Sequence, residues 1–273
     1  MTTLRPADRR RMPSFATAGL VAAALFAGAA VAAPHTFQIT REAAGVQQAD
    51  AASLCAALGP GSCTIGVETF DSRSSGSFGT DFGITSGYTI TGQYSDVTVD
   101  GAGIFGGAAG TGRYASTFSS SGYSLDLTTT NPDGINYFGF WLSALDRGNQ
   151  LAFYSGGELV FSFAPTDVDA IVGGQCPGNA YCDNPNGGLG SNGHESYVFL
   201  NFFDKTGTFD RIVFFESPQV GGYESDNHTV GYVTGDSGTP VDVPLPGTLV
   251  LAGIGLAALT LAGLHRRLRP QRS

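Results

Sequence analysis

The sequence predicts an all-β protein whose folded part is an antiparallel β-sandwich or jelly roll. Short runs rich in Val, Ile, Phe and Tyr alternate with turns made of Gly, Ser, Asn and Asp. Glycine accounts for 40 of the 273 residues, and the strand–helix–strand rhythm of a parallel sheet is not visible. The clearest expected strands span residues 88–91, 96–99, 123–127, 137–142, 151–154, 159–163, 197–203, 209–215 and 230–233.

An N-terminal segment, residues 33–63, is expected to precede the sandwich, which spans residues 64–233. Apolar residues recur at helical spacing over residues 46–58, so one short helix is expected there, ended by the Gly-Pro-Gly run at 59–61. Inside the sandwich, the sequence Ser-Gly-Gly-Glu at residues 155–158 separates two apolar runs. A short turn with glycine at this place predicts a β-hairpin.

The first 32 residues have the three parts of a secretory signal peptide. Arg5 and the arginines at 9–11 form a basic start, residues 16–31 are mostly apolar, and Ala30-Val31-Ala32 supplies a small-residue cleavage site. We expect signal peptidase to remove residues 1–32, which predicts an exported protein. An uncleaved N-terminal anchor is the alternative, and it is disfavoured because the apolar stretch is short and rich in alanine.

The C-terminal end has the composition of a single membrane span. Residues 247–264 are 18 residues without a charge, about 27 Å as a helix, which is close to the roughly 30 Å of a hydrocarbon core. Arg266, Arg267 and Arg269 follow, and such a basic cluster stays on the cytoplasmic side. A polar flexible linker, residues 234–242, is expected to join the sandwich to this span.

The charge of the exported part limits its partners. Residues 33–242 hold 6 of the 14 Lys and Arg residues and 22 of the 23 Asp and Glu residues, a net charge near −16. Nucleic acids and anionic lipid surfaces are bound by basic patches, so neither is expected as a partner.

The four cysteines form two close pairs, Cys55 with Cys63 and Cys176 with Cys182. In an oxidising envelope two short-loop disulfides are expected, although four cysteines allow three connectivities. A zinc site is the alternative. It is disfavoured because neither pair has Cys-x-x-Cys spacing and no histidine lies close to either pair.

The sequence predicts no catalytic residue. Residues 101–106 match Gly-x-Gly-x-x-Gly, but the chain continues as a loop rather than a helix, so a dinucleotide site is rejected. The nucleophile motif Gly-x-Ser-x-Gly does not occur, and His194, beside Glu195, is interpreted as a surface histidine. A non-enzymatic domain is therefore expected, and a secreted hydrolase is the least favoured class.

Two acidic clusters stand at the ends of the β region. Glu68 and Asp71 lie at its start, and Asp226 and Asn227 precede its last expected strand. In jelly rolls the first and last strands often lie side by side, so these side chains could hold a structural calcium ion through oxygen ligands. The alternative is that they are solvated strand ends. The sequence requires no other cofactor.

Trp141, the single tryptophan, lies in an aromatic run. On a strand, Tyr137 and Trp141 face one side, whereas Phe138 and Phe140 face the other. If Tyr137 and Trp141 are exposed, they form a platform on which a sugar ring can stack. If they are buried, they belong to the core.

The C-terminal segment, residues 243–273, resembles a PEP-CTERM sorting signal, which combines a Pro-x-Pro motif, a membrane span and a basic cluster. The motif residues here are Pro244, Leu245 and Pro246, followed by the span and the arginines described above. Leu245 replaces the usual acidic residue, which makes the segment closer to a Val-Pro-Leu-Pro variant. The resemblance implies cleavage near Pro246 by an exosortase, a membrane-embedded transpeptidase-like enzyme of Gram-negative envelopes.

The body of the chain resembles an exosortase-dependent surface-protein family that has no established activity. The similar stretches are residues 107–115, 137–141, 146–149, 151–157, 209–214 and 223–227.

Together these features predict an exported protein that is first held in the inner membrane by its C-terminal helix. The resemblance implies that it then reaches the cell surface or the exopolysaccharide matrix. A non-enzymatic surface or matrix role is the first expectation. The alternative is a carbohydrate-binding module of the envelope that uses Trp141, Tyr137 or the loop at residues 181–194.

Overall fold

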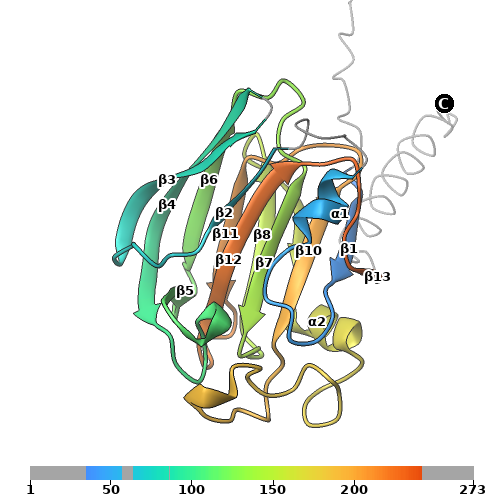
Figure 1. The fold of residues 1–273 in the computed structure, drawn as a ribbon. Coiled ribbons are helices and arrows are strands. Elements are labelled where there is room, and N and C mark those ends of the chain that lie inside the picture. Colours follow the sequence, from blue (N-terminus) through green and yellow to red (C-terminus); the bar gives the residue numbers. More distant parts are fainter. Residues whose placement is uncertain (1–34, 57–63, 86, 242–273) are drawn as a thin grey trace, which may run out of the picture. The chain divides into compact units, whose positions relative to one another are not determined.

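The structure of the protein, a computed structural model, describes residues 35–56, 64–85 and 87–241, which fold as an all-β unit (Figure 1). All the strand pairs in this part of the chain are antiparallel, as the sequence predicts. The predicted leader, residues 1–32, and the predicted span, residues 247–264, lie outside the described residues. Within the described residues, no helix combines the length and the apolar character needed to cross a membrane.

The first of two sheets contains the strands β1 (Phe37–Arg41), β2 (Thr64–Glu68), β5 (Arg113–Thr117), β7 (Tyr137–Ser143), β10 (Val198–Asp204), β12 (Tyr223–Tyr232) and β13 (Thr239–Val241). The long strand β12 pairs with β7 on one side and with β2 and β5 on the other. From β7 the order continues through β10 and β1 to β13.

The second sheet contains the strands β3 (Gly76–Thr85), β4 (Tyr88–Gly101), β6 (Tyr123–Thr129), β8 (Asn149–Ser155), β9 (Glu158–Phe163) and β11 (Arg211–Glu216). Its order is β3–β4–β6–β11–β8–β9. β4 is shared by both sheets, because its first half pairs with β6 and its last residues pair with β5. The predicted hairpin is confirmed as the pair β8–β9.

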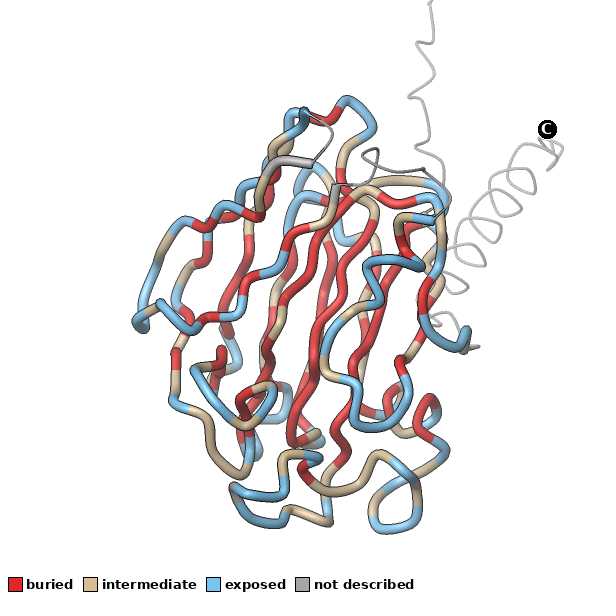
Figure 2. The backbone as a smooth tube through the Cα atoms, viewed as in Figure 1, coloured by how far each residue is buried: buried red, intermediate tan, exposed pale blue. Residues whose placement is uncertain are grey.

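The core lies between the two sheets and is mainly aromatic. The ring of Phe140 on β7 lies 5.4 Å from that of Phe214 on β11, and Phe202 on β10 lies 5.2 Å from Phe153 on β8. These contacts join one sheet to the other, so the sheets pack face to face as in a sandwich. The central strands are buried along most of their length (Figure 2).

The central strands of the first sheet are buried on their outer face as well. Strand β7 is buried at each of its residues, and its side chains alternate as predicted: Phe138 and Phe140 join the main core, whereas Tyr137 and Trp141 join two smaller apolar clusters. Helix α1 (Ala51–Cys55) contributes Leu54 to the cluster around Tyr137. A strand covered on both faces explains why this stretch is apolar without interruption.

One helix is shorter than predicted and another was not predicted. The helix expected over residues 46–58 is confirmed at Ala51–Cys55, where Asp50 caps it by accepting a hydrogen bond from the Ser53 N–H at 3.1 Å. Helix α2 (Pro165–Val172) has clear start and stop signals in the sequence. It has Pro165 in its first turn and Gly173 at its C-terminal end with a φ of 90°.

The prediction of a flexible linker at residues 234–242 is wrong for the part that the structure describes. Thr239–Val241 form β13, which pairs with β1, and the preceding Ser237 is only 3% exposed. The hydroxyl of Ser237 donates to Oε1 of the buried Glu42 at 2.6 Å. The polar composition of this segment suggested a linker, but its polar groups form hydrogen bonds with the rest of the domain. The β unit therefore extends beyond the expected range 64–233 at both ends.

Candidate functional site

Trp141 and Tyr137 do not form an exposed sugar-binding platform. Trp141 is 1% exposed and Tyr137 is 0% exposed, so both belong to the core, the alternative that the sequence left open. The Tyr137 hydroxyl donates to Oδ1 of Asn201 at 2.7 Å, and Asn201 in turn donates to Glu42 at 3.0 Å. The hydroxyl is thus satisfied inside the protein, and it offers nothing to a ligand.

The two acidic clusters are brought together as predicted, because β2 pairs with β12 and places Glu68 opposite His228. Glu68 is nevertheless fully engaged by protein groups. Its Oε2 accepts from Arg73 at 2.6 Å, and its Oε1 accepts from the Phe70 N–H at 2.8 Å. The buried carboxylate therefore has a cation and hydrogen bonds of its own.

The remaining members of these clusters also bind protein groups. Asp71 accepts from the Arg113 N–H at 3.0 Å, Asp226 accepts from the Ala108 N–H at 2.7 Å, and the Asn227 amide donates to the Gln47 carbonyl at 2.8 Å. Burial raises the pKa of Asp226 to about 7. Across the described residues, no three His, Cys, Asp or Glu side chains are grouped so that they could already hold a metal ion.

An open groove of about 450 Å³ lies beside Asn227. We call it the amide groove, because its polar side chains are carboxamides. Two of its residues, Ala109 and Asn227, have the left-handed backbone angles φ 55° and 50°. Non-glycine residues rarely adopt this conformation, and it is enriched at functional sites. The lining residues are Gly45, Val46, Gln47, Gln48, Ala108, Ala109, Asn186 and Asn227.

Three loops and strand β12, from distant parts of the chain, build the amide groove. The Gln47 amide donates to Oδ1 of Asn186 at 3.0 Å, and its oxygen accepts from the Ala109 N–H. Asn186 also donates to the Gly107 carbonyl at 3.2 Å. These bonds fix the position of the amides. The side-chain amides of Gln47, Asn186 and Asn227 donate to protein oxygens, whereas Gln48 is exposed in the groove. An exposed amide offers both donors and an acceptor to a ligand rich in hydroxyl groups.

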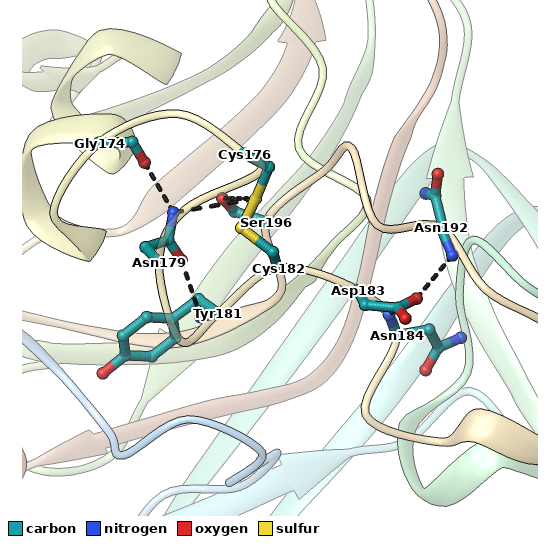
Figure 3. Close-up of a disulfide and its surroundings, with 9 residues drawn as sticks. All are labelled: Gly174, Cys176, Asn179, Tyr181, Cys182, Asp183, Asn184, Asn192 and Ser196. Carbon is teal, nitrogen blue, oxygen red and sulfur yellow. Dashed lines mark hydrogen bonds between the residues drawn. A yellow bond between two sulfur atoms is a disulfide. The ribbon is translucent and has the colours of Figure 1, made fainter.

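The disulfide predicted between Cys176 and Cys182 is confirmed, and it pins the base of the long loop after α2 (Figure 3). Inside the pinned turn, Asn179 donates to the Gly174 carbonyl at 2.7 Å. Cys55 is disulfide-bonded as well, whereas Cys63, its predicted partner, lies outside the described residues. The second part of the loop is held by Asp183, which accepts from the Asn192 N–H at 2.6 Å (Figure 3).

A smaller cavity of about 130 Å³ opens next to this disulfide. His194 and Glu195, which the sequence places side by side, line it together with Asp146 and Asp169. Burial raises the pKa of the Glu195 carboxyl, and the charge of Asp146 adds to the effect. The cavity is lined by three carboxyl groups and by Arg147, and one of its walls comes from the β7–β8 loop that contains Asp146.

His228, which lies next to a serine hydroxyl, is buried in the core. His228 Nε2 lies 3.0 Å from the Ser225 hydroxyl, and His228 Nδ1 lies 2.9 Å from the Tyr94 hydroxyl. Both Ser225 and His228 are 0% exposed, and burial lowers the pKa of His228 to about 3. A serine and a base at this distance resemble a nucleophile pair, but a substrate has no access to them.

Sequence reasoning missed most of the amide groove. Asn186 lies in the loop 181–194 that the sequence did suggest for sugar binding, and Asn227 was proposed as a calcium ligand. Gln47 and Ala109 carry no signal of their own, because they meet only through contacts between residues far apart in the chain.

The comparisons with known proteins identify the C-terminal end. Residues 242–267 match the PEP-CTERM protein-sorting motif. The match includes Pro244, Leu245, Pro246, Arg266 and Arg267, which lie outside the described residues together with Arg269. No curated protein is significantly similar to this chain. The chain therefore carries a PEP-CTERM protein-sorting motif at its C-terminal end.

Proposed function

We propose that this protein is an exported surface or extracellular-matrix protein that an exosortase-type enzyme processes at its C-terminal motif. The match of residues 242–267 to the PEP-CTERM protein-sorting motif carries this proposal. The protein is held transiently in the inner membrane of a Gram-negative cell and is then released or joined to extracellular polymer. The exosortase-type enzyme recognises the Val-Pro-Leu-Pro variant of the motif and cleaves the chain near Pro246.

The end of the folded unit supports this assignment. The last described strand, β13, ends at Val241, and the sorting motif begins at the next residue. In this arrangement the sorting segment directs the transport of the folded β-domain that precedes it. We propose that the domain itself is non-enzymatic, since its serine–histidine pair is enclosed in the core.

The localisation of the protein in a strain that lacks the sorting enzyme tests this proposal. We expect the protein to accumulate in the inner membrane with its C-terminal segment retained, because the segment of residues 247–264 is long and apolar enough to anchor it. The measurement is fractionation followed by detection with antibodies against the domain and against the C-terminal arginines. An identical processed surface form in both strains would refute the proposal.

A second candidate function is glycan binding in the amide groove. The observation that favours it is the set of carboxamides, Gln47, Gln48, Asn186 and Asn227, around an open groove with two left-handed residues. A polysaccharide of the matrix has the hydroxyl groups that such amides bind. This site replaces the platform that Trp141 and Tyr137 do not form.

The glycan candidate predicts that Gln48→Ala and Asn186→Ala each weaken binding to an envelope polysaccharide about three- to tenfold, because Gln48 supplies a neutral hydrogen-bonding group and Asn186 holds Gln47 and the Gly107 carbonyl in place. The measurement is a glycan array followed by titration of the bound glycan. Gln150→Ala is the matched control, because Gln150 lies on β8 outside the groove. Absence of binding by the wild-type protein to every envelope glycan on the array would exclude this function.

A further inference from the structure

The described part of the chain begins and finishes at the same end of the sandwich. Strands β1 and β13 are antiparallel, with Ile39 opposite Val241, so the last residue of β13 lies toward the start of β1. The chain enters β1 at Phe37, and the match to the sorting motif begins directly after Val241, at residue 242. The chain therefore enters and leaves the folded unit at one end.

The β10–β11 loop fixes both of these places. The Thr36 N–H donates to the Thr206 hydroxyl at 2.9 Å, and the Lys205 N–H donates to the Thr36 carbonyl at 2.8 Å. The Lys205 ammonium also pairs at 2.8 Å with Asp236, which lies shortly before β13. One loop thus holds the segment before β1 and the segment before β13.

Two more connections between strands meet the β10–β11 loop at this end. The Phe209 N–H donates to the Ile135 carbonyl at 3.0 Å, and the Gly156 N–H donates to Oδ2 of Asp210 at 2.8 Å. These bonds bring the β6–β7 loop and the β8–β9 turn next to the β10–β11 loop. We call the surface made by residues 35–36, 131–134, 155–157 and 204–210 the processing end.

A groove of about 270 Å³ opens between the loops of the processing end. Gly134, Ile135, Thr208 and Phe209 contribute to its lining, and Asp210 is the one charged residue among the described residues that line it. The centres of protein–protein interfaces are depleted of charged residues. The groove therefore has the composition of a surface that contacts another protein.

The position of the sorting motif decides which end of the domain its enzyme meets. From Val241 to Pro246, where we propose cleavage, the extended chain spans at most about 18 Å. Strand β12 runs from the far end of the domain to the processing end, and its 10 residues span about 30 Å. The long loop after α2 lies at the far end (Figure 1). An enzyme that holds Pro246 is therefore close to the processing end.

We propose that the processing end is the surface through which the domain contacts the membrane-embedded sorting enzyme while that enzyme holds the motif. This inference rests on the proposed function and adds the partner surface to it. The groove takes a side chain or a loop of the enzyme. The β10–β11 loop presents a fixed surface beside the groove, because hydrogen bonds hold it to the segments at both ends of the domain.

Site-specific photo-cross-linking of the full-length protein in cells tests this inference. A photoreactive phenylalanine replaces Lys205 or Asp133 at the processing end, or Ser120 in the β5–β6 turn at the far end as the matched control. All three positions are exposed. The sorting enzyme is supplied as a variant without its nucleophile, so that its complex with the motif persists. We expect enzyme adducts from Lys205 and Asp133 and none from Ser120.

Equal enzyme adducts from all three positions, or adducts with lipid alone, would overturn the inference. Coexpression with the active enzyme separates its failure from failure of the proposed function. If the wild-type chain is not shortened by the active enzyme, the proposed function and the inference both fail. If the chain is shortened but neither Lys205 nor Asp133 gives an enzyme adduct, only the assignment of the surface is wrong.

Discussion

Replacing Phe214 with alanine is expected to destabilise the protein by about 3–5 kcal/mol, the range for loss of a buried phenylalanine. Phe214 is 0% exposed on β11, and its ring stacks 4.7 Å from Tyr123 and 5.0 Å from His228. It also makes an edge contact with Phe140 of the opposite sheet. The substitution leaves a cavity between the sheets that neighbouring rings cannot fill, because each is fixed by several others. Denaturant titration of the purified protein measures the change.

Phe118→Ala is the matched control for this substitution. Phe118 has the same side chain, but it is 58% exposed. We expect a change within about 0.5 kcal/mol, as for other surface substitutions. Similar losses for Phe118→Ala and Phe214→Ala would contradict the assignment of Phe214 to the centre of the core.

Replacing His228 with glutamine is expected to change how stability depends on pH. Burial lowers the pKa of His228 to about 3, against 6.5 in the unfolded chain. Between these two values the unfolded state binds one proton more than the folded state, so the free energy of unfolding falls as the pH falls. The fall is about 1.4 kcal/mol per pH unit, or roughly 3 kcal/mol between pH 6.5 and pH 4.

The measurement is the difference in unfolding free energy between the wild type and His228→Gln at several pH values. This difference isolates the histidine, because buried carboxyl groups such as Asp226 are present in both proteins. Glutamine keeps hydrogen-bonding groups toward Tyr94 and Ser225. His194→Gln, at an exposed position, should follow the wild-type profile. Parallel profiles for the wild type and His228→Gln would show that His228 has the same pKa in the folded and unfolded states, which would contradict its burial in the core.

The parts of the fold that sequence could predict are those with strong side-chain patterns. The alternation of Tyr137, Phe138, Phe140 and Trp141 correctly placed these rings on two faces of β7. It could not tell whether the outer face is covered, because that depends on loops from elsewhere in the chain. The loops cover it, and Trp141 is therefore a core residue.

The strands β1, β2, β3, β5 and β13 are not among the clearest strands expected from the sequence, and two of them have weak patterns. β3 (Gly76–Thr85) contains three glycines and two aromatic residues, and β13 (Thr239–Val241) has only three residues, one of them proline. Their conformation is set by pairing with β4 and β1 rather than by their own propensities. Helix α2, in contrast, could have been predicted from Pro165 and Gly173.

The candidate sites depend still more on the tertiary fold. The sequence correctly placed Glu68 near Asp226, but it could not foresee that Arg73 and backbone N–H groups satisfy these carboxylates. Glu216 and Glu224 look like ordinary strand-end residues in the sequence. Only the packing of β11 and β12 reveals that both side chains are buried and that three of their four oxygens have no hydrogen-bond partner.

The most direct test of the central proposal is the identity of the two ends of the protein recovered outside the cell. Mass spectrometry of the purified, protease-digested protein measures both ends. We expect an N-terminus near Ala33 and a C-terminus near Pro246, with the segment of residues 247–273 absent. Substitution of Pro244 and Pro246 by alanine should abolish the shortened form. An extracellular protein that still ends at Ser273 would contradict the proposal that residues 242–267 act as a cleaved sorting signal.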